Sequence, residues 1–587
     1  MISSFINRAK QGESLYLCEI RDAFSSSGIS IECVVELPVG AQRHYIIPFP
    51  AASSTESAGE AEFVKEYFYA NIYNLISVLG GKKITLYINP EYSHIKELCA
   101  ALDDVFQINV QRDKRTGYGK CLNVTDRVNA AIGQPPFRFE IVSGKCEQVP
   151  PKPEGSSADA IVVFRNAVEA AQNSVLCGID IGGTDIKVVG AVNGRIKVLK
   201  EYDWCPSDMT TVDDLITPII LITRVIRVAL SMPDTDRANE LRKVMLCKDA
   251  SDDEMRSALE AAEKEFGEPV LLDGIGVNFP DVVIQNKIVG GETPKTQSIR
   301  KHSSDYEVEF GRLSSLDSKL LAHCKSGGTV KLANDGSLAA YTAAVELAHS
   351  DRAPEVENGV FAHTLGTDLG SGWIDENGKI PQIPLEAYNC VIDLGNYPAR
   401  EFDALDLRSV RGFGTGIAGT PQKYAGQSGA YRFAIQYFLE GAPELYQELI
   451  AKGFIEETND GIYVITSPRD MRKGLLEHIM VMADNGQPQA QLVFRAIGKF
   501  LAATWRETEF ILRPKAKRRV LFGRFVKRQN CFKLIQEGSK ELPGLTLDAG
   551  DDTIAFTPLM QDLKADPVYT VAQFGQAVGA AYFAVKS

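Results

Sequence analysis

A glycine-rich phrase occurs twice in this chain and restricts its possible folds more than any other feature. The first copy, residues 178–194, reads GIDIGGTDIKVVGAVNG, and the second, residues 365–378, reads LGTDLGSGWIDENG. In both copies a Gly-Thr-Asp turn leads into a short apolar run that reaches Asn-Gly. Asn-Gly between apolar runs favours a two-residue turn, because both positions of such a turn adopt positive φ. Each copy therefore predicts a glycine loop on a β-hairpin.

Such loops suit phosphate. Without Cβ atoms, the main-chain N–H groups can turn toward an anion, and a threonine hydroxyl adds a further donor. The alternative is that the glycines and threonines only make tight turns. Repetition of the same polar residues favours binding over turn-making alone, so we expect two phosphate-binding loops.

The composition agrees with a large soluble enzyme. The chain has 587 residues, 44% of them hydrophobic, and a net charge of −13. This length predicts several domains, and the acidic charge argues against nucleic acid or an anionic membrane as a partner. The first ten residues lack the apolar core of a secretion signal, so we expect a cytoplasmic protein. The eleven cysteines form no Cys-x-x-Cys pair and the seven histidines are dispersed, so we expect no Cys/His metal site.

Residues 1–150 are expected to form an extra N-terminal α/β domain of unknown role. Residues 148–158, rich in Pro, Gly and Ser, predict a linker after it. Apolar patterning in this domain predicts strands at 14–20, 29–35 and 83–88 and helices at 61–79 and 93–102.

A third element lies between the two glycine phrases. The apolar run that begins at Thr329 ends in Asn334 and Asp335, and an alanine-rich helix follows at 337–348. Open α/β sheets place their chemistry at this kind of junction, where a strand ends and a helix begins. Either residue could simply cap the helix. Because phosphate loops flank the junction in sequence, we interpret Asp335 as a general base that accepts a proton from a substrate hydroxyl.

Five motifs in order resemble the ROK family of sugar kinases and repressors, within the sugar kinase, Hsp70 and actin superfamily. The resemblance covers about residues 174–587. The motifs are Asp180-Ile-Gly-Gly-Thr184-x-x-Lys187, Gly276-Val-Asn-Phe-Pro280, Asn334-Asp335-Gly-Ser-Leu-Ala-Ala, Leu365-Gly-Thr-Asp-Leu-Gly-Ser-Gly372 and Phe574-Gly-Gln-Ala-Val-Gly-Ala-Ala581.

The resemblance implies an α/β fold of two ribonuclease-H-like (actin-like ATPase) lobes around a nucleotide cleft. The first lobe would span 174–345 together with a C-terminal helix at about 572–587, and the second would span 346–571. It also implies ATP and Mg²⁺ as cofactors, a sugar or polyol as substrate, and a possible homodimer.

The resemblance also implies roles for individual residues. Asp335 matches the catalytic base and Asp180 the carboxylate of the metal shell. Substrate binding falls to Asn334, Glu386 and Asn389. ATP and its phosphates would be bound by Gly182, Gly183, Thr184, Lys187, Gly366, Thr367 and Gly523.

Three departures from the family pattern stand out. Asn389 occupies the place of a histidine in the Glu-x-Gly-His sugar motif, and Asp368 replaces a glycine in the second loop. No cysteine occurs between Cys390 and Cys531, where a zinc motif is frequent in the family. The sequence therefore predicts a sugar kinase of glucokinase or hexokinase type, with the sugar itself left open.

The alternative is a non-catalytic, sugar-sensing regulator, since the ROK family includes repressors. The N-terminal section is patterned as α/β and is not a small basic helical module, and both Asp180 and Asp335 are present. A sensor needs neither a metal ligand nor a base, so these features favour an enzyme.

Overall fold

The computed structural model describes residues 1–51, 57–147, 159–291, 296–366, 369–395, 411–412, 414–458, 461–465, 470–540, 544–550 and 554–586. The chain divides into two compact units. Unit 1 comprises Met1–Glu154, Thr364–Ser371 and Ile383–Ala549, and unit 2 comprises Gly155–His363, Gly372–Gln382 and Gly550–Ser587. The proline-rich segment expected as a linker lies outside the described residues, and one unit boundary falls within it.

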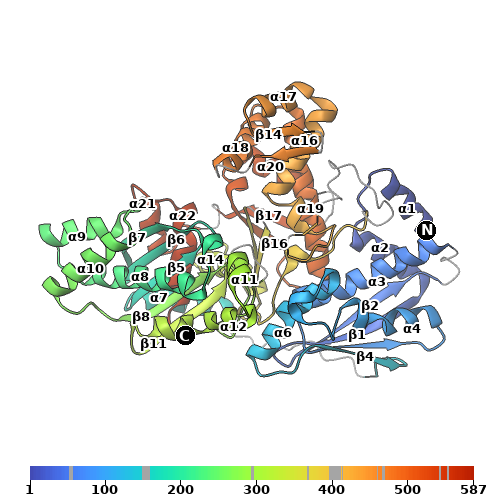
Figure 1. Ribbon diagram of the computed structural model, residues 1–587, viewed down its shortest axis with the longest axis horizontal. Coiled ribbons are helices and arrows are strands. Elements are labelled where there is room, and N and C mark those ends of the chain that lie inside the picture. Colours follow the sequence, from blue (N-terminus) through green and yellow to red (C-terminus); the bar gives the residue numbers. More distant parts are fainter. Residues whose placement is uncertain are drawn as a thin grey trace. The chain divides into compact units, whose positions relative to one another are not determined.

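Unit 2 contains a five-stranded sheet with the order β11-β8-β5-β6-β7 (Figure 1). Its strands are β5 (Val175–Ile181), β6 (Asp185–Val192), β7 (Arg195–Asp203), β8 (Leu272–Phe279) and β11 (Cys324–Asn334). The pairs β5-β6 and β6-β7 are antiparallel, whereas β8 runs parallel to both β5 and β11. This is the ribonuclease-H-like order, as expected for the first lobe.

Helices cover both faces of this sheet. On one face α22 (Val571–Phe583) approaches the strands so closely that a Cβ on Gly178 or Gly276 would lie within 2 Å of a helix carbonyl oxygen. This contact gives a packing reason for Gly178 at the start of the first glycine phrase, for Gly276 in the second motif and for the small residues of the last motif. On the other face α8 (Val212–Ser231) packs into the apolar core together with neighbouring strand residues such as Ile179.

The other elements of unit 2 are mostly helical. Two short strands, β9 (Val283–Ile284) and β10 (Lys287–Ile288), form an antiparallel hairpin after β8. The other helices are α7 (Ala160–Ala171), α9 (Asp236–Leu246), α10 (Asp252–Phe266), α11 (Gln297–His302), α12 (Tyr306–Gly311), α13 (Leu316–Leu321), α14 (Asp335–Leu347) and α21 (Pro558–Ala565).

The N-terminal section of unit 1 is an α/β layer. Its sheet has the order β2-β1-β3-β4, made of β1 (Ile29–Glu36), β2 (Gln42–Phe49), β3 (Lys83–Ile88) and β4 (Arg138–Ser143). Helix α3 (Ala58–Leu79) is buried along most of its length. The other helices are α1 (Ile2–Lys10), α2 (Leu17–Phe24), α4 (Ser93–Ala100), α5 (Leu102–Val105) and α6 (Cys121–Ala131).

The strand predicted at 14–20 is wrong. Helix α2 begins at Leu17, and its buried residues Leu17, Ile20 and Phe24 are three and four positions apart, which is helical spacing. Only a single β-bridge, between Tyr16 and Asp393, remains of the expected strand. The apolar run was too short to distinguish a buried helix from a strand.

A second sheet has the order β13-β12-β16-β17. Its strands are β12 (Val360–Leu365), β13 (Leu369–Ile374), β16 (Arg518–Gly523) and β17 (Thr546–Ala549). Read from β17 to β13, it repeats the order of the unit 2 sheet from β11 to β6, and it has no counterpart of β7. Residues 379–395, all of which the structure describes, contain no strand.

The two Asn-Gly turns differ. Asn193 and Gly194 have φ of 51° and 72°, so the first copy forms the expected turn between β6 and β7. In the second copy only Gly378 has positive φ, and the turn extends from Asp375 to Lys379. The two-residue hairpin predicted there is wrong, because the Asp375 carboxylate accepts main-chain N–H groups within a longer turn.

The remaining elements of unit 1 form a helical region. A short hairpin joins β14 (Ile455–Thr458) to β15 (Gly461–Val464). The helices are α15 (Pro421–Tyr424), α16 (Gln427–Gly441), α17 (Pro443–Ala451), α18 (Asp470–Asp484), α19 (Pro488–Leu512) and α20 (Gln529–Ser539).

A buried ion pair ties the N-terminal section to this helical region. Arg21 of α2 donates to the Glu507 carboxylate of α19 at 2.7 Å, and both side chains are almost fully buried. The Tyr45 hydroxyl donates to the Ile511 carbonyl at 2.6 Å. Breaking a buried pair costs about 3–5 kcal/mol. The N-terminal section is therefore an integral part of unit 1, and the expected three-part division becomes a division into two compact units.

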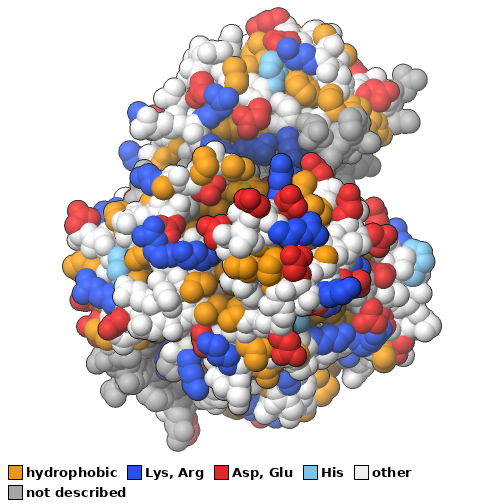
Figure 2. Space-filling view, turned by 90° about the vertical axis from the view of Figure 1, so that its left-hand side faces the viewer, with side chains coloured by type: hydrophobic (Ala, Val, Ile, Leu, Met, Phe, Trp, Pro, Cys, Tyr) orange, Lys and Arg blue, Asp and Glu red, His pale blue; other side chains and the backbone are white. Residues whose placement is uncertain are grey.

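The described helices include none that is long and apolar enough to cross a bilayer. Acidic and basic side chains are interspersed on the face shown in Figure 2. The net negative charge is thus not gathered into one acidic region on that face.

Candidate functional site

Three parallel strands of unit 2 bring polar side chains to one sheet edge. Asp180 on β5 pairs in register with Asn278 on β8, and Asn278 pairs with Ala333 on β11. Asn334 and Asp335 follow directly where β11 ends and α14 begins. The carboxyl ends of parallel strands meet at one edge, so the sheet topology explains why these distant residues assemble.

Asp180 lies in an environment that resists its negative charge. The Asn278 amide donates to Asp180 Oδ1 at 2.6 Å. The pKa of Asp180 is raised to about 6: burial is the largest cause, Asp185 and Asp335 also raise it, and Lys187 and the Asn278 hydrogen bond lower it. A divalent cation would offset this accumulation of carboxylates.

Asn278 presents a second polar atom at the same place. The residue is 2% exposed, and its Oδ1 has no hydrogen-bond partner within the described part of the chain. A buried acceptor without a donor costs about 1–3 kcal/mol. Such an acceptor suits a water molecule or a hydroxyl group that belongs to a ligand.

Asn334 and Asp335 divide the roles that the sequence left open. Asn334 is the N-cap of α14: its Oδ1 accepts from the Gly336 N–H at 3.0 Å and its Nδ2 donates to the Asp281 carbonyl at 3.0 Å. Asp335 Oδ1 also accepts from Gly336, at 2.8 Å, while its Oδ2 has no partner among the described residues. One oxygen of Asp335 therefore remains available to a substrate hydroxyl.

The first glycine loop, Gly182 to Thr184, joins β5 to β6. Its ends are fixed, since the Gly182 N–H donates to the Asp185 carbonyl at 2.8 Å and the Trp204 indole donates to the Gly182 carbonyl at 3.0 Å. The N–H groups of Gly183 and Thr184 donate to no described residue. Two main-chain donors in a fixed loop are what an anion site requires.

Lys187 is held by an acidic neighbour in the first glycine phrase. Its ammonium group forms an ion pair with Asp185, whose other oxygen accepts from the Thr184 hydroxyl at 3.1 Å. A phosphate at this loop would compete with Asp185 for both groups. Sequence reasoning assigned no role to Asp185, although it stands within the first motif.

The second glycine loop lies in unit 1. A Cβ on Gly366 would meet no atom of the described residues within 4 Å beyond its chain neighbours, and the Gly366 carbonyl accepts from the Gln427 N–H at 3.1 Å. Gly523 has φ of 113°, and a Cβ there would lie 2.2 Å from the Leu365 carbonyl oxygen, so this glycine is required by strand packing. Thr367, predicted to bind phosphate, and Asp368 lie outside the described residues.

Glu386 and Asn389, also in unit 1, do come together. The Asn389 amide donates to Glu386 Oε2 at 2.9 Å across a short 3₁₀ turn, Ala387–Asn389. The preceding residue, Leu385, has φ of 53°, an unusual conformation for a non-glycine residue. Carboxylate and amide together offer the donor and acceptor that neighbouring sugar hydroxyls require.

Helix α3 of the N-terminal section holds this pair in place. The Leu385 and Glu386 N–H groups donate to the Val78 and Ser77 carbonyls, at 2.9 and 3.2 Å. Beyond the pair, Asn74 Oδ1 accepts from the Val391 N–H at 2.7 Å and its Nδ2 donates to the Val391 carbonyl at 2.9 Å. Sequence reasoning missed Asn74, because a single asparagine in an apolar helix carries no local signal.

The predicted site residues thus form two groups. Unit 2 assembles Asp180, Asp335, Asn334 and the first glycine loop with Lys187. Unit 1 assembles Glu386 with Asn389, and Gly366 beside Gly523. Asn278, Asp185 and Asn74 join these groups as residues found only from the structure.

No protein-family model matches the sequence, and neither does any curated protein. Solved structures similar to the chain include a ROK family glucokinase from Streptomyces griseus in complex with glucose and AMPPNP. It is 19% identical, and the match covers 70% of this chain and 99% of the glucokinase, with a TM-score of 0.39. The ROK hexokinase from Thermus thermophilus is 13% identical, and the match covers 70% of this chain and 97% of the hexokinase, with a TM-score of 0.38.

A ROK family transcriptional regulator, a homologue of the E. coli MLC protein, is also similar. It is 13% identical, and the match covers 89% of this chain and 100% of the regulator, with a TM-score of 0.39. Because these identities and TM-scores are low, the architecture described above is defined by the chain's own strand order. That order makes the protein an α/β protein with a ribonuclease-H-like sheet in unit 2.

Proposed function

We propose that the protein is an ATP-dependent kinase that phosphorylates a hydroxyl group of a sugar or sugar-like polyol. The observation that carries this proposal is the position of Asp335. Its carboxylate stands at the start of α14, where β11 ends, and its Oδ2 has no partner in the described chain. Its charge also contributes to raising the pKa of Asp180. A base and a candidate metal ligand thus share one sheet edge.

The reaction assigned to Asp335 is proton removal. The substrate hydroxyl oxygen attacks the γ-phosphorus of ATP, its proton passes to Asp335 Oδ2, and the bond to the bridging oxygen breaks to release ADP. The capping hydrogen bonds of Asn334 fix the helix start on which Asp335 stands. Asp335 therefore needs no rearrangement of the main chain to accept the proton.

Mg²⁺ fits the residues present beside Asp180. A raised carboxylate pKa and the unpartnered, buried Oδ1 of Asn278 are both relieved when a hydrated cation is held there. Mg²⁺ usually keeps several waters and takes one or two carboxylates from the protein. When bound, it would neutralise phosphate charge. Asp180 would hold the ion, and Asn278 would accept from one of its waters.

Phosphate oxygens would be bound by the main chain. The N–H groups of Gly183 and Thr184 supply donors in unit 2, and the open space at Gly366 leaves room for close approach in unit 1. We assign sugar hydroxyls to Glu386 and Asn389, whose paired side chains provide an acceptor and a donor. Asn334 contributes mainly by capping α14.

The direct test is a panel of sugars, amino sugars and polyols incubated with the purified full-length protein, ATP and Mg²⁺. ADP release is measured together with the mass of the product. We expect one or a few compounds to gain a phosphoryl group. Sugar binding by calorimetry with no ADP release from any compound would contradict the proposal and favour a sensor.

A further inference from the structure

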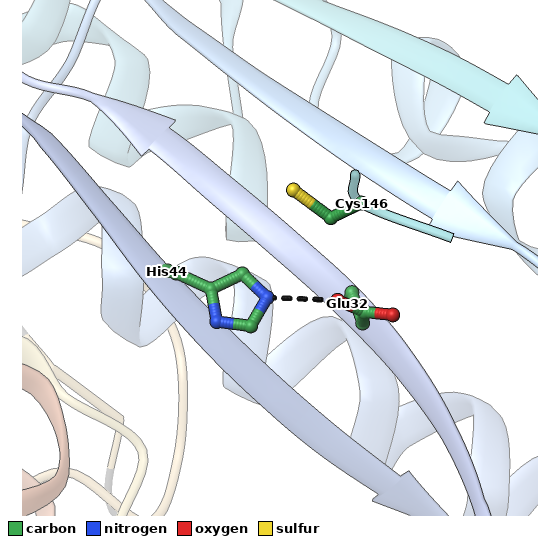
Figure 3. A group of neighbouring side chains, drawn as sticks. All are labelled: Glu32, His44 and Cys146. Carbon is green, nitrogen blue, oxygen red and sulfur yellow. Dashed lines mark hydrogen bonds and ion pairs between the residues drawn. The ribbon is translucent and has the colours of Figure 1, made fainter. Parts of the chain in front are cut away.

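The outer face of the N-terminal sheet carries a cluster of three side chains that the kinase chemistry does not use. Glu32 lies on β1, His44 on β2, and Cys146 follows the end of β4 (Figure 3). His44 is opposite Val34 in the strand register, so it lies two positions along β1 from Glu32 on the same face. The sheet thus gathers residues that are far apart in sequence.

The ligand atoms of the cluster are close together. One ligand atom from each residue lies within 4.8 Å of those of the other two, and His44 Nε2 is 3.0 Å from Glu32 Oε2. Tyr87, which pairs with Glu32 in register on β3, also interacts with Cys146. The thiol is therefore placed over this face of the sheet and does not point away from it.

The chemistry of this set matches one metal best. Imidazole nitrogen, thiolate sulfur and carboxylate oxygen are the ligands that Zn²⁺ takes, at about 2.0–2.3 Å, which puts neighbouring ligand atoms about 3.3–3.8 Å apart. Bringing ligand atoms that are up to 4.8 Å apart to this spacing requires about 1 Å of side-chain movement. All three residues are partly exposed, so they have room to move.

The surroundings also favour direct ligation. The His44 and Glu32 side chains are only 14% and 23% exposed, which shields the pair from bulk water. A cation that replaces the proton shared by these two groups keeps both of them partnered. Three protein ligands leave a fourth tetrahedral position for water.

We propose that Glu32, His44 and Cys146 form a zinc site that pins the end of the N-terminal section to its own sheet. The ion would link β1 and β2 to the segment that leaves β4, shortly before the unit boundary at Glu154 and Gly155. This site is independent of the proposed kinase reaction. Its role is to hold the exit of the N-terminal section against the sheet.

The test uses Co²⁺ as a spectroscopic probe in the metal-free, full-length protein. We expect one equivalent to bind and to give a sulfur-to-cobalt charge-transfer band, which Zn²⁺ then removes by displacement. Cys146→Ser should abolish the band. His44→Gln should weaken Co²⁺ binding by more than the roughly 10–100-fold typical of losing an outer-shell partner.

Matched controls separate this site from adventitious thiol binding. Cys205 and Cys247 are exposed cysteines in unit 2, and the double change Cys205→Ser and Cys247→Ser should leave the band unchanged. A second readout is the midpoint of thermal unfolding, which Zn²⁺ should raise in the wild type but not in Cys146→Ser. Absence of the band in the wild type, or an equal band in Cys146→Ser, would overturn the proposal.

Discussion

Asp180 and Asn278 stand opposite each other on parallel strands, and the Asn278 amide donates to the Asp180 carboxylate over 2.6 Å. This hydrogen bond favours the ionised carboxylate and so opposes burial, the largest cause of a pKa that is raised to about 6. The Oδ1 of the same amide, which has no partner among the described residues, lies at the same sheet edge. Asn278 thus connects the charge state of Asp180 to whatever occupies that edge.

Asn278→Ala should weaken binding of Mg²⁺·ATP. Loss of the amide removes a hydrogen bond to a charged group, worth about 1.5–3 kcal/mol, so the Asp180 pKa should rise further and the affinity should fall about tenfold or more. Titration calorimetry measures this change. Asn239→Ala, on the exposed surface of α9, is the control and should have no effect. Unchanged affinity in Asn278→Ala would separate Asp180 from metal binding.

Gly366→Val should block ATP binding while leaving the fold intact. A Cβ at this position meets no atom of the described residues within 4 Å beyond its chain neighbours, so we expect the side chain to obstruct a ligand more than it disturbs the packing. The control is Gly59→Val, because Gly59 also lies in unit 1 with no atom within 4 Å of a Cβ. Equal ATP affinity in Gly366→Val and wild type would remove the second loop from the phosphate site.

Asn74→Ala should raise the KM for the sugar and leave the ATP affinity nearly unchanged. It removes both hydrogen bonds to the Val391 main chain, at a cost of about 1–3 kcal/mol, and so releases the segment that carries Glu386 and Asn389. Steady-state kinetics measure the KM, with the exposed Asn89→Ala as control. An equal loss of sugar and ATP binding would indicate general destabilisation instead.

The stability of unit 2 should fall in acid because of His323. Burial, together with the charges of Arg227 and Arg224, lowers the His323 pKa from 6.5 to about 4. The unfolded chain therefore binds a proton that the folded chain does not, and the free energy of unfolding declines as the pH falls from 6.5 to about 4. His323→Gln should reduce this decline in urea titrations, whereas the exposed His302→Gln should not. An unchanged pH dependence in His323→Gln would contradict this assignment.

The sheet edge of unit 2 could be predicted from local sequence patterns. Asp180 stands in an apolar run before a glycine loop, and Asp335 stands between an apolar run and an alanine-rich helix. Both patterns span only a few neighbouring residues, so they can be recognised without knowing any long-range contact. The same reasoning separated Asn334 from Asp335 only in part, because the cap assignment depends on hydrogen bonds to Gly336 and Asp281.

The role of the N-terminal section could not be predicted. Its attachment depends on pairs such as Arg21 with Glu507 and Asn74 with Val391, whose members are far apart in sequence. A proline-rich stretch signals a boundary between units but does not say which later segment the preceding residues pack against. The zinc cluster was missed for the same reason, since its ligands are gathered only by the sheet.

If Asp335 is the base of the phosphoryl transfer, its replacement by the isosteric amide in Asp335→Asn should stop turnover. On the best substrate from the panel, we compare turnover in this variant with turnover in Asp305→Asn, a control aspartate that caps α12. We expect turnover to fall about a hundredfold or more in Asp335→Asn, with ATP affinity and unfolding temperature unchanged, and to stay near normal in the control. Wild-type turnover in Asp335→Asn would exclude Asp335 as the base and leave it as a helix-start residue only.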